Sequence, residues 1–252
     1  MSLRKKIMAC MAVLSLSVGL FVPTSLASEL DQKQENLKKY EIQKEFQIKD
    51  IEKRYANDIE VRDRLINKIN NDEMLDNINP DKKDLGIEKK IGENTTVTTF
   101  PDGSTIVSGM DLSNATILDS KGKVIKGPND AVTGGNWSSG SGFKCVKNAK
   151  VENYIGGNYD MYYYADFCIH QGKSTPDILQ RVFGIMISTP DGDFDITDQG
   201  VFRGKEIPGS YSAYGGYKFK YTRYDSNGVG SSRFVYVYLR VGNDTYWEDK
   251  SL

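Results

Sequence analysis

Few residues in this chain could perform acid–base or nucleophilic chemistry. His170 is the only histidine, so a Ser/His/Asp or Cys/His device would have to use it, and a site with several imidazole ligands is excluded. The sequence has no nucleophile elbow, no HExxH motif and no phosphate-binding glycine loop. We therefore expect no catalytic residues and a protein that is not an enzyme. A pair of carboxylates distant in sequence is the one catalytic arrangement that the composition leaves open.

The densest acidic run is Asp191-Gly192-Asp193-Phe194-Asp195-Ile196-Thr197-Asp198. Carboxylates at nearly every second position can supply the oxygen ligands that a calcium ion requires. The candidate metal ligands are therefore Asp191, Asp193, Asp195 and Asp198. An EF-hand loop would need glycine at Ile196 and glutamate at Phe202. The pattern favours the alternative, an acidic hairpin turn, and calcium is the one cofactor that the sequence suggests.

Aromatic residues gather in the second half of the chain, where 13 of the 15 tyrosines and both tryptophans follow Ala131. Their rings can stack on sugar C–H groups while their polar atoms form hydrogen bonds. The loop Pro208–Tyr217 is rich in glycine, serine and tyrosine, a composition typical of recognition loops. The candidate ligand-binding residues are Trp137, Tyr211, Tyr214, Tyr217 and Trp247. The alternative, which the residue type alone favours, is that tyrosine serves as a half-buried strand former.

The first 27 residues have the pattern of a secretory signal peptide. Three basic residues at 4–6 precede an apolar stretch, Ile7–Val22, that is short for a membrane span. Ser25-Leu26-Ala27 then supplies the small residues that a signal peptidase reads. We expect cleavage before Ser28 and a secreted, extracellular product with no membrane-spanning segment.

Secretion also bears on the cysteines and on the net charge. Cys10 leaves with the signal, so the oxidising compartment favours a disulfide between Cys145 and Cys168 over two free thiols or metal ligands. The whole chain has 33 basic and 34 acidic residues, and the signal removes three basic ones, which leaves 30 against 34. A chain so close to neutral has no strong field to attract nucleic acid, so we expect no nucleic-acid partner.

These residues must be positioned by two kinds of element, of which the first is helical. Residues 28–76 have apolar residues at helical spacing and several acid–base pairs four residues apart, which predicts one long amphipathic helix. The pattern favours an arm that rests on its own domain, and the alternative is a coiled coil through which the protein self-associates. Residues 77–93 have the composition of a linker.

After the linker, the hydrophobic period changes to two. Residues 94–130 predict two short β-hairpins, and residues 131–252 predict a β-sandwich domain. In Tyr159–Ile169 the odd-numbered residues from Met161 onward form a core face. In Arg233–Val241 apolar residues occupy both faces, which indicates a strand that is central or lies beneath another layer. The predicted fold is mainly β: an antiparallel β-sandwich, Greek-key or jelly-roll-like, preceded by a long N-terminal helix.

Two stretches carry a resemblance to known proteins. Gly134–Phe143, which begins Gly-Gly-Asn-Trp, and Tyr238–Trp247 resemble the ends of uncharacterised small secreted proteins of Gram-positive bacteria. The Gly-Gly-x-Trp opening is also distantly similar to the lactococcin 972 bacteriocin family, and this resemblance implies a β-sandwich.

The sequence therefore predicts a secreted, non-enzymatic binding or interaction module at or near the bacterial cell surface. Its expected partner is cell-wall glycan or a surface protein. One alternative is a secreted toxin or bacteriocin-like effector. A second alternative is a hydrolase of cell-wall glycan that depends on two carboxylates.

Overall fold

The structure, a computed structural model, describes residues 24–92, 94–118, 123–126, 142–172, 174–190 and 194–251. Most of the predicted signal peptide lies outside the described residues, as do three candidate site residues, Trp137, Asp191 and Asp193. Among the described residues, no helix is both long and apolar enough to cross a membrane.

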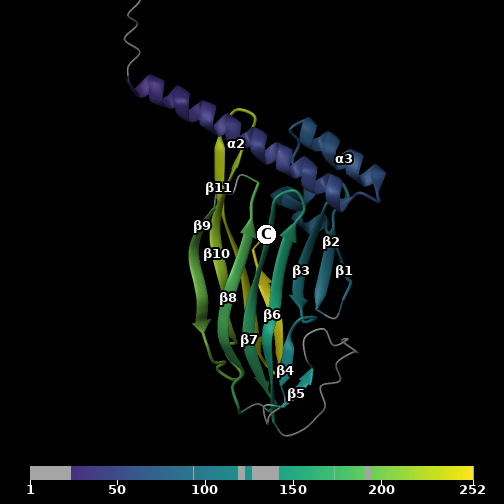
Figure 1. The fold of residues 1–252 in the computed structure, drawn as a ribbon, viewed down its shortest axis with the longest axis vertical. Helices are drawn as coiled ribbons and strands as arrows, with labels where there is room; N and C mark the ends of the chain where they lie inside the picture. The colour runs from purple at the N-terminus through teal and green to yellow at the C-terminus, as the bar shows by residue number, and fades with distance from the viewer. Residues whose placement is uncertain are drawn as a thin grey trace, which may run out of the picture.

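The fold is mainly β, with two antiparallel sheets and helices at the N-terminal side (Figure 1). The eight-stranded sheet contains β1 (Ile87–Lys90), β2 (Thr95–Thr99), β3 (Thr105–Asp111), β4 (Thr116–Leu118), β5 (Val124–Lys126), β6 (Phe143–Ile155), β7 (Tyr159–His170) and β8 (Ile178–Ser188). The four-stranded sheet contains β9 (Phe194–Arg203), β10 (Ala213–Tyr224), β11 (Gly230–Gly242) and β12 (Thr245–Lys250). The two sheets confirm the predicted mainly β class. All their described strand pairs are antiparallel, whereas βαβ units would give parallel pairs.

Strand order follows the chain closely in both sheets. The four-stranded sheet runs β12-β11-β10-β9, and in the eight-stranded sheet β6, β7 and β8 are paired in succession. β7 takes one edge of β6, while β3 and β4 share the other, with β3 along Lys150–Ile155 and β4 along Cys145–Lys147. β11 pairs with β10 on one side and with β12 on the other, which confirms that it is an internal strand.

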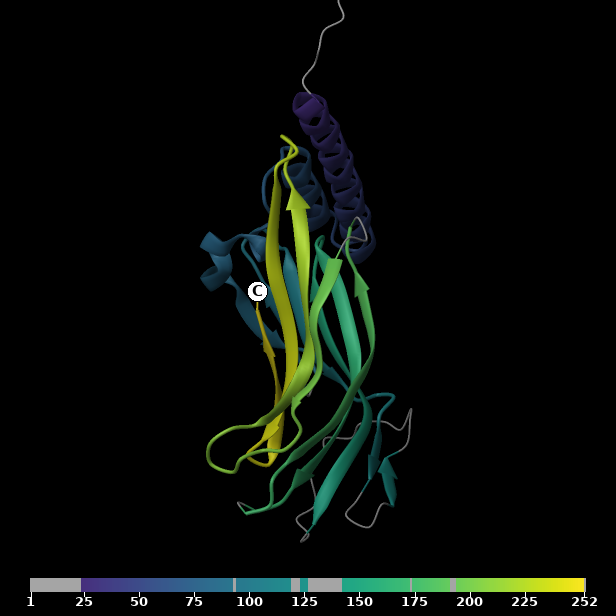
Figure 2. The same ribbon diagram turned by 90° about the vertical axis from the view of Figure 1, so that its left-hand side faces the viewer.

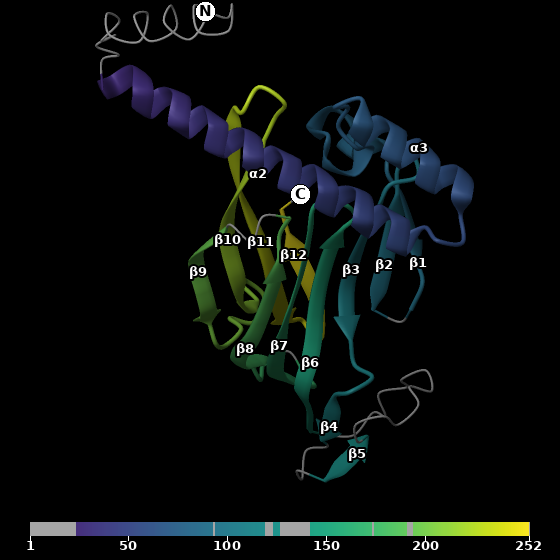
Figure 3. The same ribbon diagram turned by 45° about the horizontal axis from the view of Figure 1, so that its top comes forward.

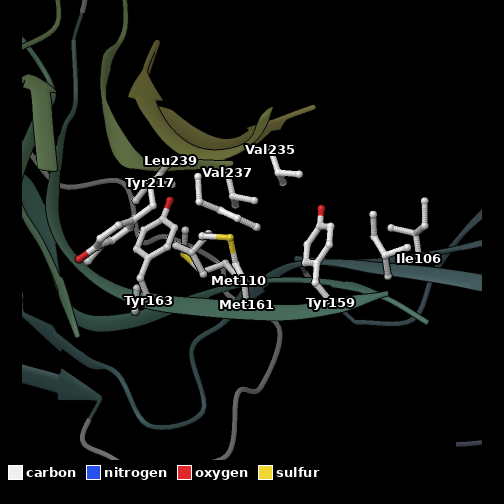
Figure 4. Close-up of a cluster of buried hydrophobic side chains, with 14 of the residues drawn as sticks. Ile106, Met110, Tyr159, Met161, Tyr163, Tyr217, Val235, Val237 and Leu239 are labelled. Atoms are coloured by element: carbon white, nitrogen blue, oxygen red, sulfur yellow. The ribbon is translucent and has the colours of Figure 1, made fainter. Parts of the chain in front are cut away.

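The core lies between the two sheets, where β7 faces β11. Figure 4 shows Tyr159, Met161 and Tyr163 pointing from β7 toward Val235, Val237 and Leu239 of β11. All six side chains are at most 1% exposed. Alternation at period two places them on one side of each strand, which confirms the predicted core faces of both segments.

The predicted single helix over residues 28–76 is wrong, because the chain forms two helices. α2 (Thr24–Arg54) and α3 (Ile59–Asn70) are separated by a turn, and the Asp58 side chain caps α3 by accepting a hydrogen bond from the Val61 N–H at 3.1 Å. α3 folds back along α2, so Lys44 Nζ donates to the Asn70 carbonyl oxygen at 3.3 Å. Folding back buries Leu65 and Ile69 against the rest of the protein, which one straight helix could not do.

α2 lies across one end of both sheets, as Figures 1 and 3 show. The Gln43 amide donates to Thr222 O at 2.9 Å and accepts from the Tyr224 N–H at 3.0 Å, so it joins α2 to β10. Farther along, Asp50 Oδ2 accepts from the Tyr154 hydroxyl and from the Gly157 N–H at 3.0 Å, so it joins α2 to the turn between β6 and β7. The arm therefore rests on its own domain, as the sequence pattern favoured.

The predicted linker, residues 77–93, is instead part of the folded body over the described residues 77–92. Two 3-10 helices (Asp76–Ile78 and Pro80–Leu85) lead into β1, which pairs with β2. The Asn77 side chain donates to the carbonyl oxygens of Thr105 and Gly156, both at 3.0 Å. These contacts depend on tertiary position and leave no hydrophobic pattern, so composition alone could not show them.

The strands β2 and β3 also belong to the same sheet as β6. The hairpin predicted from Thr95 to Val107 forms as expected. A boundary at residue 131, however, would separate β3 from β6, whose backbones are hydrogen-bonded over six residue pairs. The predicted division into a hairpin region and a sandwich domain therefore cuts through one sheet.

A disulfide joins Cys145 of β6 to Cys168 of β7, as predicted. The two residues are direct partners in the antiparallel register, with 4.0 Å between their Cα atoms. The disulfide therefore fixes the pairing of two neighbouring strands where β6 begins and β7 ends. Figure 2 shows that this end of the two strands lies opposite to α2.

Candidate functional site

The outer surface of the four-stranded sheet gathers aromatic side chains from three strands. Because Val235, Val237 and Leu239 point into the core, alternation turns Tyr236 and Tyr238 outward on β11. We name the outward-facing rings of Phe202, Tyr214, Tyr236 and Tyr238 the aromatic face.

The rings of the aromatic face are in mutual contact. The Phe202 ring of β9 lies 5.4 Å from the rings of Tyr214 on β10 and Tyr238 on β11, measured between centroids. Tyr236 and Tyr238 are stacked at 4.9 Å with 20° between their planes. Offset and edge-to-face pairs at these separations are favourable, so the rings hold one another in fixed positions.

Two arginines fix the edges of the aromatic face. The Arg203 guanidinium lies 4.9 Å from the ring centroid of Tyr211 and 5.3 Å from that of Tyr214. Arg240 lies 5.1 Å from the Tyr214 centroid and donates from Nε to Asp249 Oδ2 at 2.6 Å. Cation–π contacts of this kind stabilise ring and guanidinium together, and they leave N–H groups at the rim that can donate to a ligand.

The aromatic face is accessible to solvent. Its four rings are half-buried, while Tyr211 beside them is 61% exposed and Trp247 on β12 is 38% exposed. Burial raises the pKa of the Tyr238 hydroxyl, and nearby acidic groups add to the effect, so this hydroxyl remains protonated at neutral pH and can donate a hydrogen bond. The surface therefore combines flat apolar rings with hydrogen-bonding groups at their edges.

The structure brings together part of the predicted ligand-binding set. Tyr211 and Tyr214 meet at Arg203, and Trp247 lies opposite Arg240 in the register of β12 and β11. Tyr217 was predicted wrongly as a ligand-binding residue: its side chain is 5% exposed and packs on Tyr163 at 5.3 Å in the core. The fifth candidate, Trp137, lies outside the described residues.

The error at Tyr217 and the omission of Phe202, Tyr236 and Tyr238 have different origins. β10 begins at Ala213, so Tyr217 belongs to a strand and not to the preceding loop, and alternation sends it inward. The alternation of residues in Arg233–Val241 already indicated that Tyr236 and Tyr238 lie on the face opposite to the core. The position of Phe202 beside them could not be predicted without the register between β9 and β10.

The acidic run does not converge where it is described. In the register of β9 and β10, Asp195 lies opposite Lys220 and Asp198 opposite Lys218. Their carboxylates are therefore placed beside lysines, whose charge complements theirs across the strands. Among the described residues, no group of three or more histidine, cysteine, aspartate or glutamate side chains could hold a metal ion.

His170 is the last residue of β7, at the start of the connection to β8. Its ring lies 5.0 Å from that of Phe143, and its backbone N–H donates to Asp177 Oδ1 at 2.7 Å. The Asp177 carboxylate also accepts from the Asp244 N–H at 3.0 Å, while Glu206 accepts from the Asp177 N–H at 3.1 Å. These acids are thus engaged by backbone N–H groups that tie the loops of the two sheets together.

Comparison with known proteins adds little to this description. No protein-family model and no curated protein matches the chain. Among solved structures, a hypothetical protein from Listeria monocytogenes EGD-e aligns with a TM-score of 0.28 and 12% identity, over 68% of this chain and 98% of that chain. A likeness of that degree carries no argument about fold or function, so function must be argued from the residues.

Proposed function

We propose that this chain is a secreted, non-enzymatic binding module that acts at or near the bacterial cell surface. Its ligand is cell-wall glycan, and its binding site is the aromatic face. The observation that carries this proposal is the cluster of four contacting, solvent-accessible rings on one sheet surface, bordered by Arg203 and Arg240.

The chemistry of the aromatic face suits a sugar. Axial C–H groups of a pyranose ring pack on an aromatic ring, while hydroxyls at the sugar's edge accept from guanidinium N–H groups and donate to carboxylates. Arg203, Arg240 and Asp249 provide such groups beside the rings. Three of the four rings project from strands paired on both sides, β10 and β11, so little conformational entropy is lost on binding.

We also propose that the two sheets form a β-sandwich. The support is the buried layer of side chains between β7 and the four-stranded sheet, which includes an edge-to-face contact of Tyr159 with Phe219 of β10 at 5.5 Å. The Greek-key or jelly-roll-like connectivity stays a prediction: in the described strands, neighbours in a sheet are mostly neighbours in the chain. Secretion also stays a proposal, supported by the pattern of the first 27 residues and by the disulfide.

Binding to purified cell wall tests the proposed function. We expect Tyr238→Ala to lower the affinity of the mature protein for wall glycan at least tenfold, about 1.4 kcal/mol, because it removes the ring that touches three others. Tyr164→Ala is the matched control. Tyr164 is a half-buried tyrosine of the eight-stranded sheet that also stacks on a neighbour, Phe183, at 5.9 Å.

The assay separates the expected partner from its alternatives. Retention on wall that has been stripped of protein by a protease, without release of soluble sugar, supports a glycan-binding module. Binding that disappears with the protease treatment points to a surface protein and contradicts the glycan. Equal losses in Tyr238→Ala and Tyr164→Ala would show that the aromatic face is not the site.

A further inference from the structure

A cavity of about 360 Å³ lies beneath the helical arm, at the end of the core. α2 contributes Tyr40, Lys44 and Gln47 to its walls, and the hairpin of β10 and β11 contributes Arg223, Val229 and Arg233. Figure 3 shows α2 crossing above this hairpin, with α3 alongside it. The cavity is thus lined by elements that are far apart in the sequence.

The two arginines occupy positions that alternation assigns to the interior. Tyr217, Phe219 and Tyr221 of β10 are buried, and Arg223 is the next residue on the same side of the strand. On β11, Arg233 likewise precedes the buried residues Val235 and Val237 on their side of the strand. The sequence therefore places a positive charge at the end of each row of inward-facing residues, one on β10 and one on β11, beneath α2.

Within the described ranges, part of the Arg233 guanidinium lacks the hydrogen-bond partners that buried polar groups normally have. Nε and Nη2 of Arg233 are inaccessible to solvent and have no hydrogen-bond partner among the described residues. Burial lowers the pKa of Arg223, and the positive charge of Arg233 lowers it further against the opposing effect of Tyr221. Both arginine side chains are half-buried, and their like charges repel each other with no carboxylate of the described chain between them to offset the repulsion.

Three acids line the cavity, Asp72, Glu73 and Asp225; Glu73 is exposed and forms no ion pair with either arginine in the described part of the chain, and the other two are engaged elsewhere. Asp72 Oδ1 accepts from Lys44 Nζ at 3.1 Å and also from the Tyr40 hydroxyl. Asp225 Oδ1 accepts from the backbone N–H groups of Asn227 and Val229, at 2.9 and 2.8 Å. No carboxylate in the described part of the chain forms an ion pair with Arg223 or Arg233, so their charges are available to a ligand.

We infer that this cavity binds a small amphiphilic anion, with its acidic head group on Arg223 and Arg233 and its apolar body in the remainder of the cavity. A carboxylate or a phosphate supplies the paired oxygens that guanidinium groups bind through two parallel hydrogen bonds. Ile69, Met74 and Ile78 line the rest of the cavity with apolar side chains. The volume is within the range of small-molecule sites.

The probes for this site are octanoate, octyl phosphate, inorganic phosphate and 1-octanol, titrated calorimetrically into the mature protein. We expect the two amphiphilic anions to bind and to raise the thermal midpoint, with inorganic phosphate weaker because it leaves the apolar walls empty. The tighter of octanoate and octyl phosphate identifies the head group. Octanol binding as tightly as octanoate, or no binding of either amphiphilic anion, would overturn the inference.

Arg233→Gln should weaken the amphiphilic anion at least tenfold. Lys220→Gln, which removes the same charge from the opposite face of β10, should leave the affinity unchanged. Without ligand, Arg233→Gln should be at least as stable as the natural protein, because it relieves the repulsion. Arg233→Lys keeps the charge but loses the two parallel N–H groups of the guanidinium, so we expect an intermediate affinity. This variant still tests the site if Arg233→Gln fails to fold. Unchanged affinity in Arg233→Lys would contradict the site.

Discussion

Glu248 of β12 points toward the interior and lines a second cavity, between β12 and β3. Burial raises the pKa of its carboxyl to about 7, against the opposing effects of Lys250 and of the hydrogen bond from Asn153. The unfolded chain ionises this group near its ordinary value of 4.5. Between these two values the folded protein holds a proton that the unfolded chain has lost, so the contribution to stability is largest below about pH 4.5 and is lost as the pH rises through 7.

We therefore predict that Glu248→Gln stabilises the protein relative to the natural chain at pH 8 more than at pH 5. The difference should be about 1–2 kcal/mol, less than the full pKa shift would give because the cavity is partly open to water. Denaturant unfolding at several pH values measures it. Glu88→Gln, an exposed glutamate on the same cavity, is the control and should show no such trend. A pH-independent effect of Glu248→Gln would contradict the raised pKa.

At the scale of single residues, sequence reasoning succeeded where a rule is local. The pairing of Cys145 with Cys168 followed from their count and compartment, and the buried face of β7 followed from alternation. It failed at Tyr217, because the start of β10 at Ala213 determines which way every later residue of that strand points. An error of a few residues at a strand boundary thus turned a core side chain into a supposed ligand contact.

Among the elements, the turn between α2 and α3 depends on one capping residue. The Asp58 side chain satisfies the Val61 N–H at the start of α3, a helix of 12 residues that would be marginal alone. We predict that Asp58→Ala lowers the free energy of unfolding by about 1 kcal/mol, as loss of an N-cap usually does. Chemical denaturation measures this. Asp63→Ala, an exposed acid within α3, is the control. Equal effects of the two substitutions would show that the cap is not important.

The turn between α2 and α3 could not be predicted, because the sequence on both sides of it has a helical pattern. Asp58 and Arg62 are four residues apart, the spacing of a helical ion pair, yet Asp58 serves as the cap and Arg62 contacts Asp63 instead. Neither glycine nor proline marks the turn between Arg54 and Ile59. The deciding factor is the burial of Leu65 and Ile69 in the hydrophobic core, and that depends on residues brought together only by the fold.

The whole molecule has a core shared by both sheets and by the arm. β-strands of regular spacing predicted two antiparallel sheets, but not that β1 to β5 would extend the sheet of β6, because pairing between distant strands is set by register and not by composition. The broken heptad favoured an arm that rests on its own domain. The contacts of Asn36, Gln43 and Asp50 could not be predicted, because each side chain forms a hydrogen bond with a backbone group whose position is fixed only by the fold.

Because one core joins these parts, the disulfide should stabilise the molecule as a unit. Reduction, or replacement of both Cys145 and Cys168 by alanine, should lower the free energy of unfolding by roughly 3 kcal/mol, since the bond restricts the unfolded chain over a separation of 23 residues. Unfolding should remain a single transition when it is followed by tyrosine fluorescence and by circular dichroism. Glycan binding by the folded variant should be unchanged, because the disulfide lies in the eight-stranded sheet and the aromatic face belongs to the other. Two separate transitions, or a loss of binding with the fold intact, would show that the two sheets do not behave as one cooperative body.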